Sequence, residues 1–507
     1  MVIYLISFAL AFYALAFWFF SKKSDSRLPW PLMLVAALAV YFLGLGMVDA
    51  PAVYRLQALA RDFLFLGASG AFFGYLAGRR RWFFAGLGVA TLALIFFMRG
   101  VQYPTFPYKA PIPLDETGEF LVELKGGAGA ASLEALQNRY DLRIARAFFP
   151  ADTSITDLDN YYVVDVPGRG AAKMAKIAHL LRSNEAVVWV EGNEQVQAEP
   201  LPAQNVPAAG DNSARYGLND PGVSNLWAFR EMSMEKLFGL LEQEKVKPVK
   251  KALVAILDTG VDAGHEDLRS NYVSLKPAFD NDPKGHGTHC AGIAAAVSNN
   301  SVGIASFSRD NAFYNVTSVK VLGAGGIGTQ KTIIEGMLFA ADGGAAVLSM
   351  SLGGPSNQSA QRAYQKAVAY AATKGAVVVA AAGNSNRNAK DFSPANTPGL
   401  ICVSAVDDQL NRALFSNFVK EIPMAVAAAG VDIYSTVPGN QYAAYSGTSM
   451  AAPQVAGLLG LMKSLRPGLT AKEAFDLLHS SGKETKDTPM TGKFVQPYRA
   501  ISRLLGK

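Results

Sequence analysis

The stretch GTSMAAPQVAGLLGLMKSL, from Gly447 to Leu465, joins a turn of small residues to an apolar segment long enough for a buried helix. Ser449 stands at the start of that helix. The first four N–H groups of a helix lack intrahelical partners, and the positive end of the helix dipole favours negative charge. Both features suit a serine nucleophile whose attack creates an oxyanion. The stretch alone fits a serine that merely caps the helix equally well, so the rest of the chain must decide.

Composition limits the class of protein. The chain has 507 residues, enough for about three domains of ~100–200 residues each. Half of the residues are hydrophobic, so membrane segments are expected. The net charge is +6, but no nucleic-acid-reading motif is present, and we expect no nucleic-acid partner. The two cysteines, Cys290 and Cys402, form neither a disulfide framework nor a zinc pattern, and are expected to be buried free thiols.

Residues 1–100 contain four apolar stretches, which predict an all-α transmembrane region of about four helices. The stretches are Val2–Phe20, Pro31–Met47, Phe63–Gly78 and Trp82–Met98. Basic residues follow the first and third stretches, and the positive-inside rule therefore places both short loops in the cytoplasm. We expect a membrane anchor over residues 1–100, with the rest of the chain extracytoplasmic (periplasmic or extracellular). The alternative is a pair of helical hairpins with a re-entrant piece.

A proline-rich linker over residues 101–116 precedes a small domain over residues 117–199. Strand-like and helix-like periodicities alternate there in the order βαββαβ. This order predicts a ferredoxin-like α+β domain, a fold that does not by itself specify a function. A connector rich in Pro, Ala, Gly and Asn follows over residues 200–215. Exposed connectors of this kind are where proteolytic cleavage concentrates, so a processing site is expected in it.

Strands alternate with helices over residues 216–507. Continuous apolar strands are expected at 252–258, 316–322, 345–352, 376–384 and 400–406, with helices at 331–343 and 359–375. This pattern predicts an α/β domain whose parallel sheet has helices on both faces. Functional sites in such sheets lie beyond the carboxyl ends of the strands.

Four polar residues are expected at such strand ends or at helix starts. Asp258 ends a strand in ILDTGVD, His286 opens a helix in GHGTHCAG, and Asn384 follows a strand in AAAGNSN. Together with Ser449 they fit acyl transfer, which needs a nucleophile, a base, a group that orients the base, and oxyanion donors. Each residue alone has an ordinary interpretation as a cap or turn residue. Their joint occurrence favours a catalytic site.

The motifs DTGVD, HGTHCAG, LSMSLGG, AAAGN and GTSMAAP, in this order over residues 216–500, resemble the subtilisin family of serine endopeptidases. The resemblance implies a subtilisin-like fold with an Asp-His-Ser triad. Asp258 would orient the imidazole, His286 would act as general base and acid, and Ser449 would be the nucleophile. The amide of Asn384 and the N–H of Ser449 would form the oxyanion hole.

The same resemblance assigns residues that bind a polypeptide substrate. They belong to an edge that pairs with the extended substrate and to a pocket beside it: Ser351, Leu352, Gly353, Ala382 and Gly383. Small residues in the 381–384 segment would leave room for a sizeable apolar side chain. The depth of the pocket depends on residues 392–396, which the sequence does not place, so the side-chain preference stays open.

The resemblance implies no cofactor for catalysis, but it does imply a structural calcium site. Asp267 and Asn300 would supply side-chain oxygen ligands, which suit calcium. The alternative is two unrelated polar residues in solvated turns. Cys290 occupies the position where a thiol-containing subset of the family carries its cysteine, so mercurials are expected to inhibit. His289 and Asp262 would be structural.

The resemblance also makes residues 117–199 a propeptide that inhibits its own protease within the same chain. Its last stretch, Gln195–Pro200, would occupy the substrate cleft until a cut between Glu199 and Tyr216. We therefore expect a membrane-anchored, self-processing serine endopeptidase that acts through an acyl-enzyme. Two alternatives are a catalytically silent scaffold on the same fold and a membrane sensor with one dedicated substrate.

Overall fold

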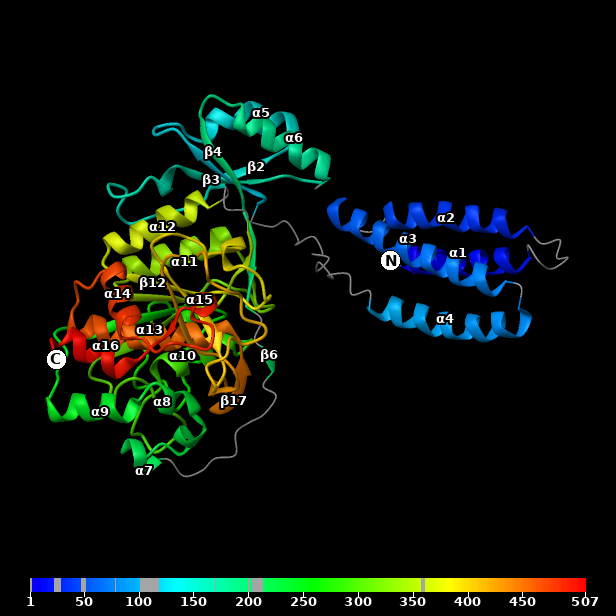
Figure 1. The fold of residues 1–507 in the computed structure, drawn as a ribbon. Helices are drawn as coiled ribbons and strands as arrows, with labels where there is room; N and C mark the ends of the chain where they lie inside the picture. Colours follow the sequence, from blue (N-terminus) through cyan, green and yellow to red (C-terminus); the bar gives the residue numbers. More distant parts are fainter. Residues whose placement is uncertain are drawn as a thin grey trace. The chain divides into compact units, whose positions relative to one another are not determined.

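A computed structural model describes residues 2–21, 29–46, 52–77, 79–100, 118–168, 170–198, 201–202, 213–356 and 361–507. The chain forms two compact units, Met1–Ile112 and Pro113–Lys507 (Figure 1). The predicted linker over 101–116, and most of the predicted connector over 200–215, lie outside the described residues.

Four helices make up the N-terminal unit. They are α1 (Val2–Ser21), α2 (Trp30–Gly46), α3 (Ala52–Leu76) and α4 (Arg80–Gly100). Aromatic and aliphatic side chains from all four helices pack in one core. Asp62 is buried beside this core, where it accepts a hydrogen bond of 3.0 Å from the hydroxyl of Tyr41 and pairs with Arg61 at 2.8 Å. The four predicted helices therefore exist and pack against one another.

The membrane prediction for this unit is wrong. Among the helices that the structure describes, none is both long enough and apolar enough to cross a membrane. α2 has 17 residues, whereas a span typically needs ~20. α3 and α4 carry charged residues within their bounds, such as Arg61 and Asp62 in α3 and Arg99 in α4. This finding overturns the transmembrane anchor predicted for residues 1–100 and, with it, the prediction of an integral membrane protein.

A four-stranded antiparallel sheet opens the second unit. Its elements are β1 (Phe120–Leu124), η1 (Ala130–Leu133), α5 (Glu134–Tyr140), β2 (Arg143–Arg146), η2 (Leu158–Asn160), β3 (Tyr161–Asp165), α6 (Ala171–Arg182) and β4 (Val187–Gly192). The strand order across the sheet is β2-β3-β1-β4. Apolar side chains of the sheet and of α6 share one core. After β4, the short strands β5 (Gln195–Gln197) and β6 (Leu201–Pro202) pair with the larger domain instead of this sheet.

A seven-stranded sheet organises the larger domain. Its strands are β7 (Ala252–Asp258), β8 (Tyr314–Lys320), β10 (Val347–Met350), β12 (Val377–Ala381), β14 (Ile401–Val406), β15 (Ala425–Ala429) and β18 (Lys493–Phe494). They lie in the order β18-β15-β14-β12-β10-β7-β8, and every neighbouring pair is parallel. All five predicted strands are present, although β8 begins two residues before its predicted start. The predicted parallel α/β fold is confirmed.

Helices cover both faces of this sheet (Figure 1). α10 (His286–Ala295) and α13 (Thr448–Leu465) pack on one face, and α11 (Gln330–Asp342) and α12 (Arg362–Thr373) pack on the other. Alternate residues of β7 show the two sides: Val254 and Ile256 pack in the core of the first face, and Ala255 and Leu257 in that of the second. Burial on both faces explains why the strands are continuous apolar runs.

Shorter elements complete the domain. They are α7 (Ser213–Tyr216), η3 (Pro221–Asn225), α8 (Trp227–Glu231), α9 (Met234–Gln243), η4 (Pro277–Phe279), β9 (Ile327–Thr329), β11 (Gly354–Pro355), η6 (Ala389–Asp391), β13 (Phe392–Ser393), β16 (Ile433–Val437), β17 (Gln441–Ser446), α14 (Ala471–Ser481), α15 (Thr488–Thr491) and α16 (Pro497–Leu504). β16 and β17 form an antiparallel hairpin that ends directly before α13. This hairpin brings the chain back to the carboxyl end of the sheet, where α13 begins.

Candidate active site

A buried carboxylate and an imidazole meet at the carboxyl end of the sheet. Asp258 is the last residue of β7, and His286 is the first residue of α10. Nδ1 of His286 lies 2.8 Å from Oδ1 and 2.9 Å from Oδ2 of Asp258. The side chain of Asp258 is 0% exposed and that of His286 is 1% exposed. Because an ionised carboxylate only accepts hydrogen bonds, this contact assigns the proton of the neutral imidazole to Nδ1 and leaves Nε2 as the basic nitrogen.

Ser449 lies in the first turn of α13, next to this pair. Its hydroxyl donates to the main-chain carbonyl of Ser351 at 3.1 Å, and its own carbonyl accepts from the hydroxyl of Ser351 at 2.8 Å. Nε2 of His286 is buried and has no hydrogen-bond partner within the described part of the chain. Catalytic hydrogen bonds often form only when substrate is bound. Here the serine side chain would have to rotate away from Ser351 before it could donate to His286.

Asn384 is held by the residue that precedes Ser449. Its Oδ1 accepts from the N–H of Thr448 at 2.9 Å and from the Thr448 hydroxyl at 2.8 Å. These two bonds fix the orientation of the amide and direct its Nδ2 to the other side. A side chain at Gly447 would bring a Cβ atom to 3.2 Å from that Nδ2, so the glycine keeps the space around the amide donor open. Thr448 therefore positions the predicted oxyanion donor, a role that the sequence analysis missed.

Asp282 is a second residue that the sequence analysis missed. It is buried and accepts hydrogen bonds from the N–H of Gly285 at 2.8 Å, from the N–H and hydroxyl of Thr288 at 2.8 Å each, and from the hydroxyl of Thr259 at 2.8 Å. Thr259 directly follows Asp258, and the other two donors flank His286. One carboxylate thus ties together the two segments that carry the Asp258–His286 pair. The signal in the sequence was an aspartate in the glycine-containing turn DPKG, four residues before His286.

Cys290 is one helical turn after His286. Its Sγ, a carboxylate oxygen of Asp258 and a ring nitrogen of His286 all lie within 4.8 Å of one another. The thiol donates a hydrogen bond to the main-chain carbonyl of Ser449 at 3.4 Å, and burial raises its pKa well above the usual value. Cys290 is therefore a protonated thiol beside the Asp258–His286 pair. Both cysteines are free and buried, as predicted.

Two further polar residues near the site have structural partners. Nε2 of His289 contacts the carbonyl of Ala443 at 3.0 Å, and burial lowers the pKa of this histidine to about 3. It is neutral at physiological pH and is not part of the Asp258–His286 pair. Asp262 accepts hydrogen bonds from the N–H of Gly439 at 2.9 Å and of Gly264 at 3.1 Å, which joins two loops.

Three of the five predicted substrate-binding residues, Leu352, Gly353 and Gly383, line one cavity of about 100 Å³. Ser351, Leu352 and Gly353 directly follow β10, and the 381–384 segment ends and follows β12. The cavity is lined by Leu352, Gly353, Ala381, Gly383, Asn384, Phe392 and Ser449, among others. Ala382 does not line it, because its side chain points into the core on the opposite side. The structure therefore brings most of these residues together and replaces Ala382 by its neighbour Ala381.

The two predicted metal-binding residues are in contact with each other. Nδ2 of Asn300 donates to Oδ1 of Asp267 at 2.8 Å, and the N–H of Ile304 donates to Oδ2 at 2.8 Å. Asp267 is fully buried, and burial, reinforced by the nearby carboxylates of Asp220 and Glu266, raises its pKa to about 8. Asp220 is also buried, and neither it nor Asp267 forms an ion pair with a Lys or Arg among the described residues.

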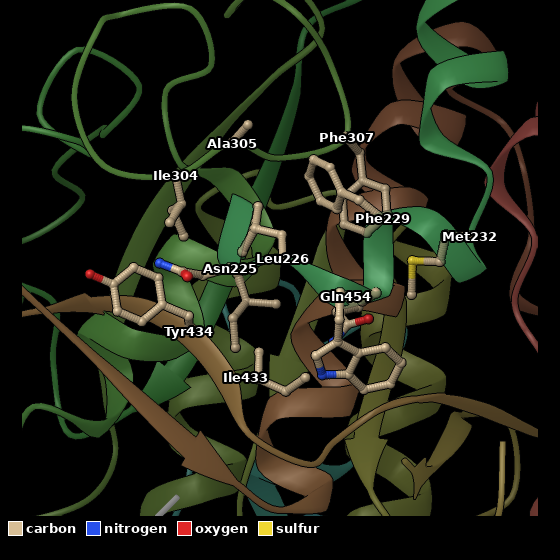
Figure 2. Close-up of a pocket in the computed structure, with 13 residues that line it drawn as sticks. Asn225, Leu226, Phe229, Met232, Ile304, Ala305, Phe307, Ile433, Tyr434 and Gln454 are labelled. Carbon is tan, nitrogen blue, oxygen red and sulfur yellow. The ribbon is translucent and has the colours of Figure 1, made fainter. Parts of the chain in front are cut away.

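A separate apolar cavity of about 30 Å³ is lined by residues of η3, α8, α10, the 304–307 loop, β16 and α13 (Figure 2). Its lining includes Leu226, Phe229, Ile433 and Gln454, but none of the candidate catalytic residues. A cavity needs about 10–15 Å³ to hold a water molecule, so this one has room for about two or three water molecules but not for a peptide. The cavity beside Ser449 is therefore the candidate reaction site.

A buried Asp–His pair, a serine at a helix N-terminus and an amide held beside that serine are the parts of a serine hydrolase. Comparison with known proteins gives the class. Residues 249–494 match the family model described as the subtilase family. The chain is 46% identical to thermitase from Thermoactinomyces vulgaris, over 42% of this chain and 75% of thermitase. It is 40% identical to subtilisin DY from Bacillus licheniformis, over 47% of this chain and 86% of that protein.

Among solved structures, a protease from Pseudoalteromonas arctica PAMC 21717 aligns with 57% of this chain and 99% of its own chain. The sequence identity is 28% and the TM-score is 0.49. The matches to thermitase and to subtilisin DY extend over most of each relative. The chain belongs to the subtilase family, and it is a subtilisin-like serine endopeptidase.

Proposed function

We propose that Ser449, His286 and Asp258 carry out peptide-bond hydrolysis in this chain. The observation that carries this assignment is the pair of contacts, 2.8 and 2.9 Å, between Nδ1 of His286 and the carboxylate of Asp258. It leaves the buried Nε2 of His286 as the base beside α13, whose first turn carries Ser449. A histidine bound in this way can accept a proton and is stabilised as the imidazolium by the adjacent carboxylate.

The reaction then follows from the geometry. Oγ of Ser449 attacks the carbonyl carbon of the scissile bond while Nε2 of His286 takes the hydroxyl proton. The tetrahedral intermediate collapses when His286 gives that proton to the leaving nitrogen, and the acyl-enzyme remains on Ser449. A water molecule repeats the two steps: it attacks the ester, loses a proton to His286 and releases the acid and the free serine. No cofactor takes part in any step.

Two donors would stabilise the oxyanion in both steps. One is the amide of Asn384, whose orientation is fixed by Thr448, and the other is the N–H of Ser449 in the first turn of α13. Fixed donors of this kind need no reorganisation when the charge develops, and losing one typically costs about 100–1,000-fold in kcat. The main chain of Ser351–Gly353 would bind the substrate as an added strand.

A fluorophosphonate probe tests the assignment, because it reacts only with an activated serine. We expect one labelled peptide, containing Ser449, in a mass-spectrometric digest of the active enzyme. Ser449→Ala should remove the label and peptide hydrolysis together, whereas Ser480→Ala, an exposed serine on α14, should change neither. Labelling of a different serine, or hydrolysis that survives Ser449→Ala, would contradict the assignment.

We further propose that residues 117–199 are a propeptide domain that inhibits the protease within the same chain. The support comes from β5, which follows the last strand of the small domain's sheet but pairs with the larger domain. β5 pairs antiparallel with β9, and Gln197 and Gly353 exchange two main-chain hydrogen bonds of 3.1 Å each. The N–H of Ala198 donates to Gly326 at 3.0 Å. This tail therefore uses the same Gly353 main chain that would bind a substrate.

The chain continues on the other side of Ser449. Leu201 and Pro202 of β6 pair antiparallel with Ser446 and Tyr445 of β17, directly before the turn that leads to Ser449. The residues between, Glu199 and Pro200, lie outside the described part of the chain. Main-chain pairing on both sides of the nucleophile is how an extended peptide lies across a protease cleft. This arrangement supports an intramolecular inhibitor that is in place before any cut.

Charged side chains of the small domain also hold it to the protease. The carboxylate of Glu191 accepts hydrogen bonds from the N–H groups of Arg362 and Ala363, at 2.9 and 3.1 Å, which are the first two residues of α12. Glu123 pairs with Lys366 at 2.9 Å and with Arg362 at 3.1 Å. Carboxylates at a helix N-terminus are favoured by the unpaired N–H groups and by the dipole. Acidic groups on one domain thus face a basic helix start on the other.

We propose, finally, that Asp267 and Asn300 hold a structural calcium ion. The support is that Asp267 and the neighbouring Asp220 are buried carboxylates that pair with no Lys or Arg among the described residues. Nδ2 of Asn300 faces Asp267, and its Oδ1 accepts from the N–H of Val302, so the amide would have to turn to offer its oxygen to the ion. A divalent cation with oxygen ligands would neutralise this charge and tie the loop after α10 to the segment that carries Asp267. Its role would be stability and not catalysis.

A further inference from the structure

Two amide oxygens without a partner border the apolar cavity that is separate from the catalytic residues. This cavity has a volume of about 30 Å³, and aromatic rings such as those of Trp227 and Phe307 form much of its wall (Figure 2). Asn225 of η3 and Gln454 of α13 also line it. Oδ1 of Asn225 and Oε1 of Gln454 are buried, and neither has a hydrogen-bond partner within the described part of the chain.

The orientation of the Gln454 amide is fixed by its nitrogen. Nε2 donates to the carbonyl of Ala429 at 2.7 Å and to the carbonyl of Met450 at 3.3 Å. Since a carbonyl oxygen only accepts hydrogen bonds, the atom that faces these two groups must be the nitrogen. The side chain is 4% exposed and lines the cavity. Its oxygen is therefore a buried acceptor on the side away from the two carbonyls.

The other lining side chains offer these two oxygens no donor. The indole N–H of Trp227 donates to the carbonyl of Val431 at 3.0 Å. Figure 2 shows the hydroxyl of Tyr434 pointing away from Gln454, and the remaining lining side chains are apolar. Buried polar atoms in native proteins nearly always have a hydrogen-bond partner, because an acceptor without one loses its hydration and gains nothing in return. A donor from outside the chain would satisfy both oxygens.

The volume of the cavity selects the donor. A buried water molecule needs about 10–15 Å³ and two to four polar partners, so about two fit here. Two water molecules that are bonded to each other, with one donating to each amide oxygen, would have two partners apiece. A larger ligand is excluded, because even benzene requires a cavity of about 150 Å³.

We propose that this cavity is a binding site for a pair of ordered water molecules, which join Asn225 to Gln454 and thereby η3 to α13. The amide of Gln454 also donates to the carbonyl of Met450, the residue that follows Ser449. Hydrogen bonds in a chain polarise one another, so a water molecule on the oxygen of this amide strengthens the bonds that its nitrogen makes. The water pair thus connects the segment before β7 to the turn that carries Ser449.

Magnetic relaxation dispersion of the water oxygen nucleus tests the site, because it counts water molecules that stay bound for longer than the protein takes to tumble. The full-length Ser449→Ala protein serves as the reference. In that background, Gln454→Met keeps the length of the side chain but removes the acceptor, and we expect it to lose about two long-lived water molecules. Asn225→Leu, which changes a partly exposed residue, should lose at least one.

Gln496→Met provides the matched control. Gln496 is also 4% exposed, and its Nε2 also donates to two main-chain carbonyls, at 2.8 and 3.3 Å, but it does not line the cavity. This variant should keep the count of the reference protein. An unchanged count in Gln454→Met and Asn225→Leu, or an equal loss in Gln454→Met and Gln496→Met, would overturn the site. If Gln454→Met fails to fold, the count in Asn225→Leu decides alone.

Discussion

The hydroxyl of Ser449 donates its hydrogen bond to the main-chain carbonyl of Ser351, over 3.1 Å. Ser351 directly follows β10, and it belongs to the segment that is proposed to pair with substrate. The hydroxyl of the nucleophile is therefore bonded to the proposed substrate-binding segment. Nε2 of His286 has no hydrogen-bond partner among the described residues. A rotation of one side chain would convert this resting arrangement into the serine–histidine contact that attack requires.

Removal of the amide at position 384 should lower turnover while substrate binding is retained. We expect Asn384→Leu to reduce kcat by about 100–1,000-fold with little change in KM, since the donor acts on a charge that exists only in the transition state. Thr448→Val, which removes the hydroxyl that holds Asn384 at 2.8 Å, should cost about tenfold, and Thr448→Ser should restore activity. Steady-state kinetics on a peptide substrate would reveal the difference. A rise in KM with unchanged kcat in Asn384→Leu would show that the amide binds substrate instead.

Mercurials should inhibit through Cys290. Its Sγ lies within 4.8 Å of a carboxylate oxygen of Asp258 and of a ring nitrogen of His286, so a mercury atom on this sulfur would displace the imidazole. Iodoacetamide needs the thiolate and should react poorly near neutral pH, because burial keeps the pKa of this thiol high. Activity assays would compare Cys290→Ala, expected to resist mercurials, with Cys402→Ala, expected to stay sensitive. Equal sensitivity of both variants would rule out Cys290 as the target.

Much of the site could be predicted from the sequence because its residues lie where an apolar strand pattern ends or a helix pattern begins. Asp258 ends β7 where the apolar run ends, and Ser449 follows a small-residue turn. Asp282 and Thr448 were missed because their function is to hold other residues, and it depends on loop geometry that no periodicity encodes. The membrane prediction failed for a related reason. It rested on the lengths of apolar runs, but the helices do not end where these runs end, and charged residues lie within α3 and α4.

His289 should make the protease domain sensitive to acid. Its pKa is lowered to about 3 by burial, against 6.5 for the exposed imidazole. A histidine whose pKa is depressed in the folded state binds its proton more readily when unfolded, so stability falls as the pH drops below 6.5 and continues to fall toward 3. The loss between pH 6.5 and pH 4 is on the order of 3 kcal/mol, at about 1.4 kcal/mol for each pKa unit.

Urea unfolding of the Ser449→Ala protein at several pH values would measure this loss without self-digestion. His289→Gln should flatten the pH dependence in this window, because glutamine can still donate to Ala443 but does not titrate. His479→Gln, at the end of α14, provides the matched control and should keep the wild-type slope. If both variants follow the wild-type curve, His289 is not the source of the acid sensitivity.

Calcium removal should destabilise the protease domain. A site saturated at about 100 times its Kd contributes about 2.7 kcal/mol, which for a domain of roughly 290 residues corresponds to about 4–5 °C in Tm. We therefore expect EGTA to lower the Tm of the Ser449→Ala protein by that amount, and calcium but not magnesium to restore it. Asp267→Asn should have a low Tm that no longer responds to calcium. A wild-type Tm that is the same in EGTA and in calcium would contradict the proposed calcium site.

The most direct test of the central claim follows the fate of the full-length chain. Wild-type protein and the Ser449→Ala variant would be produced side by side, and any new N-terminus would be identified by mass spectrometry. We expect the wild type to yield a protease fragment that begins between residues 199 and 216, hydrolyses peptides and is no longer inhibited by its tail, whereas Ser449→Ala should stay intact. Identical cleavage of both proteins, or peptide hydrolysis by Ser449→Ala, would contradict it.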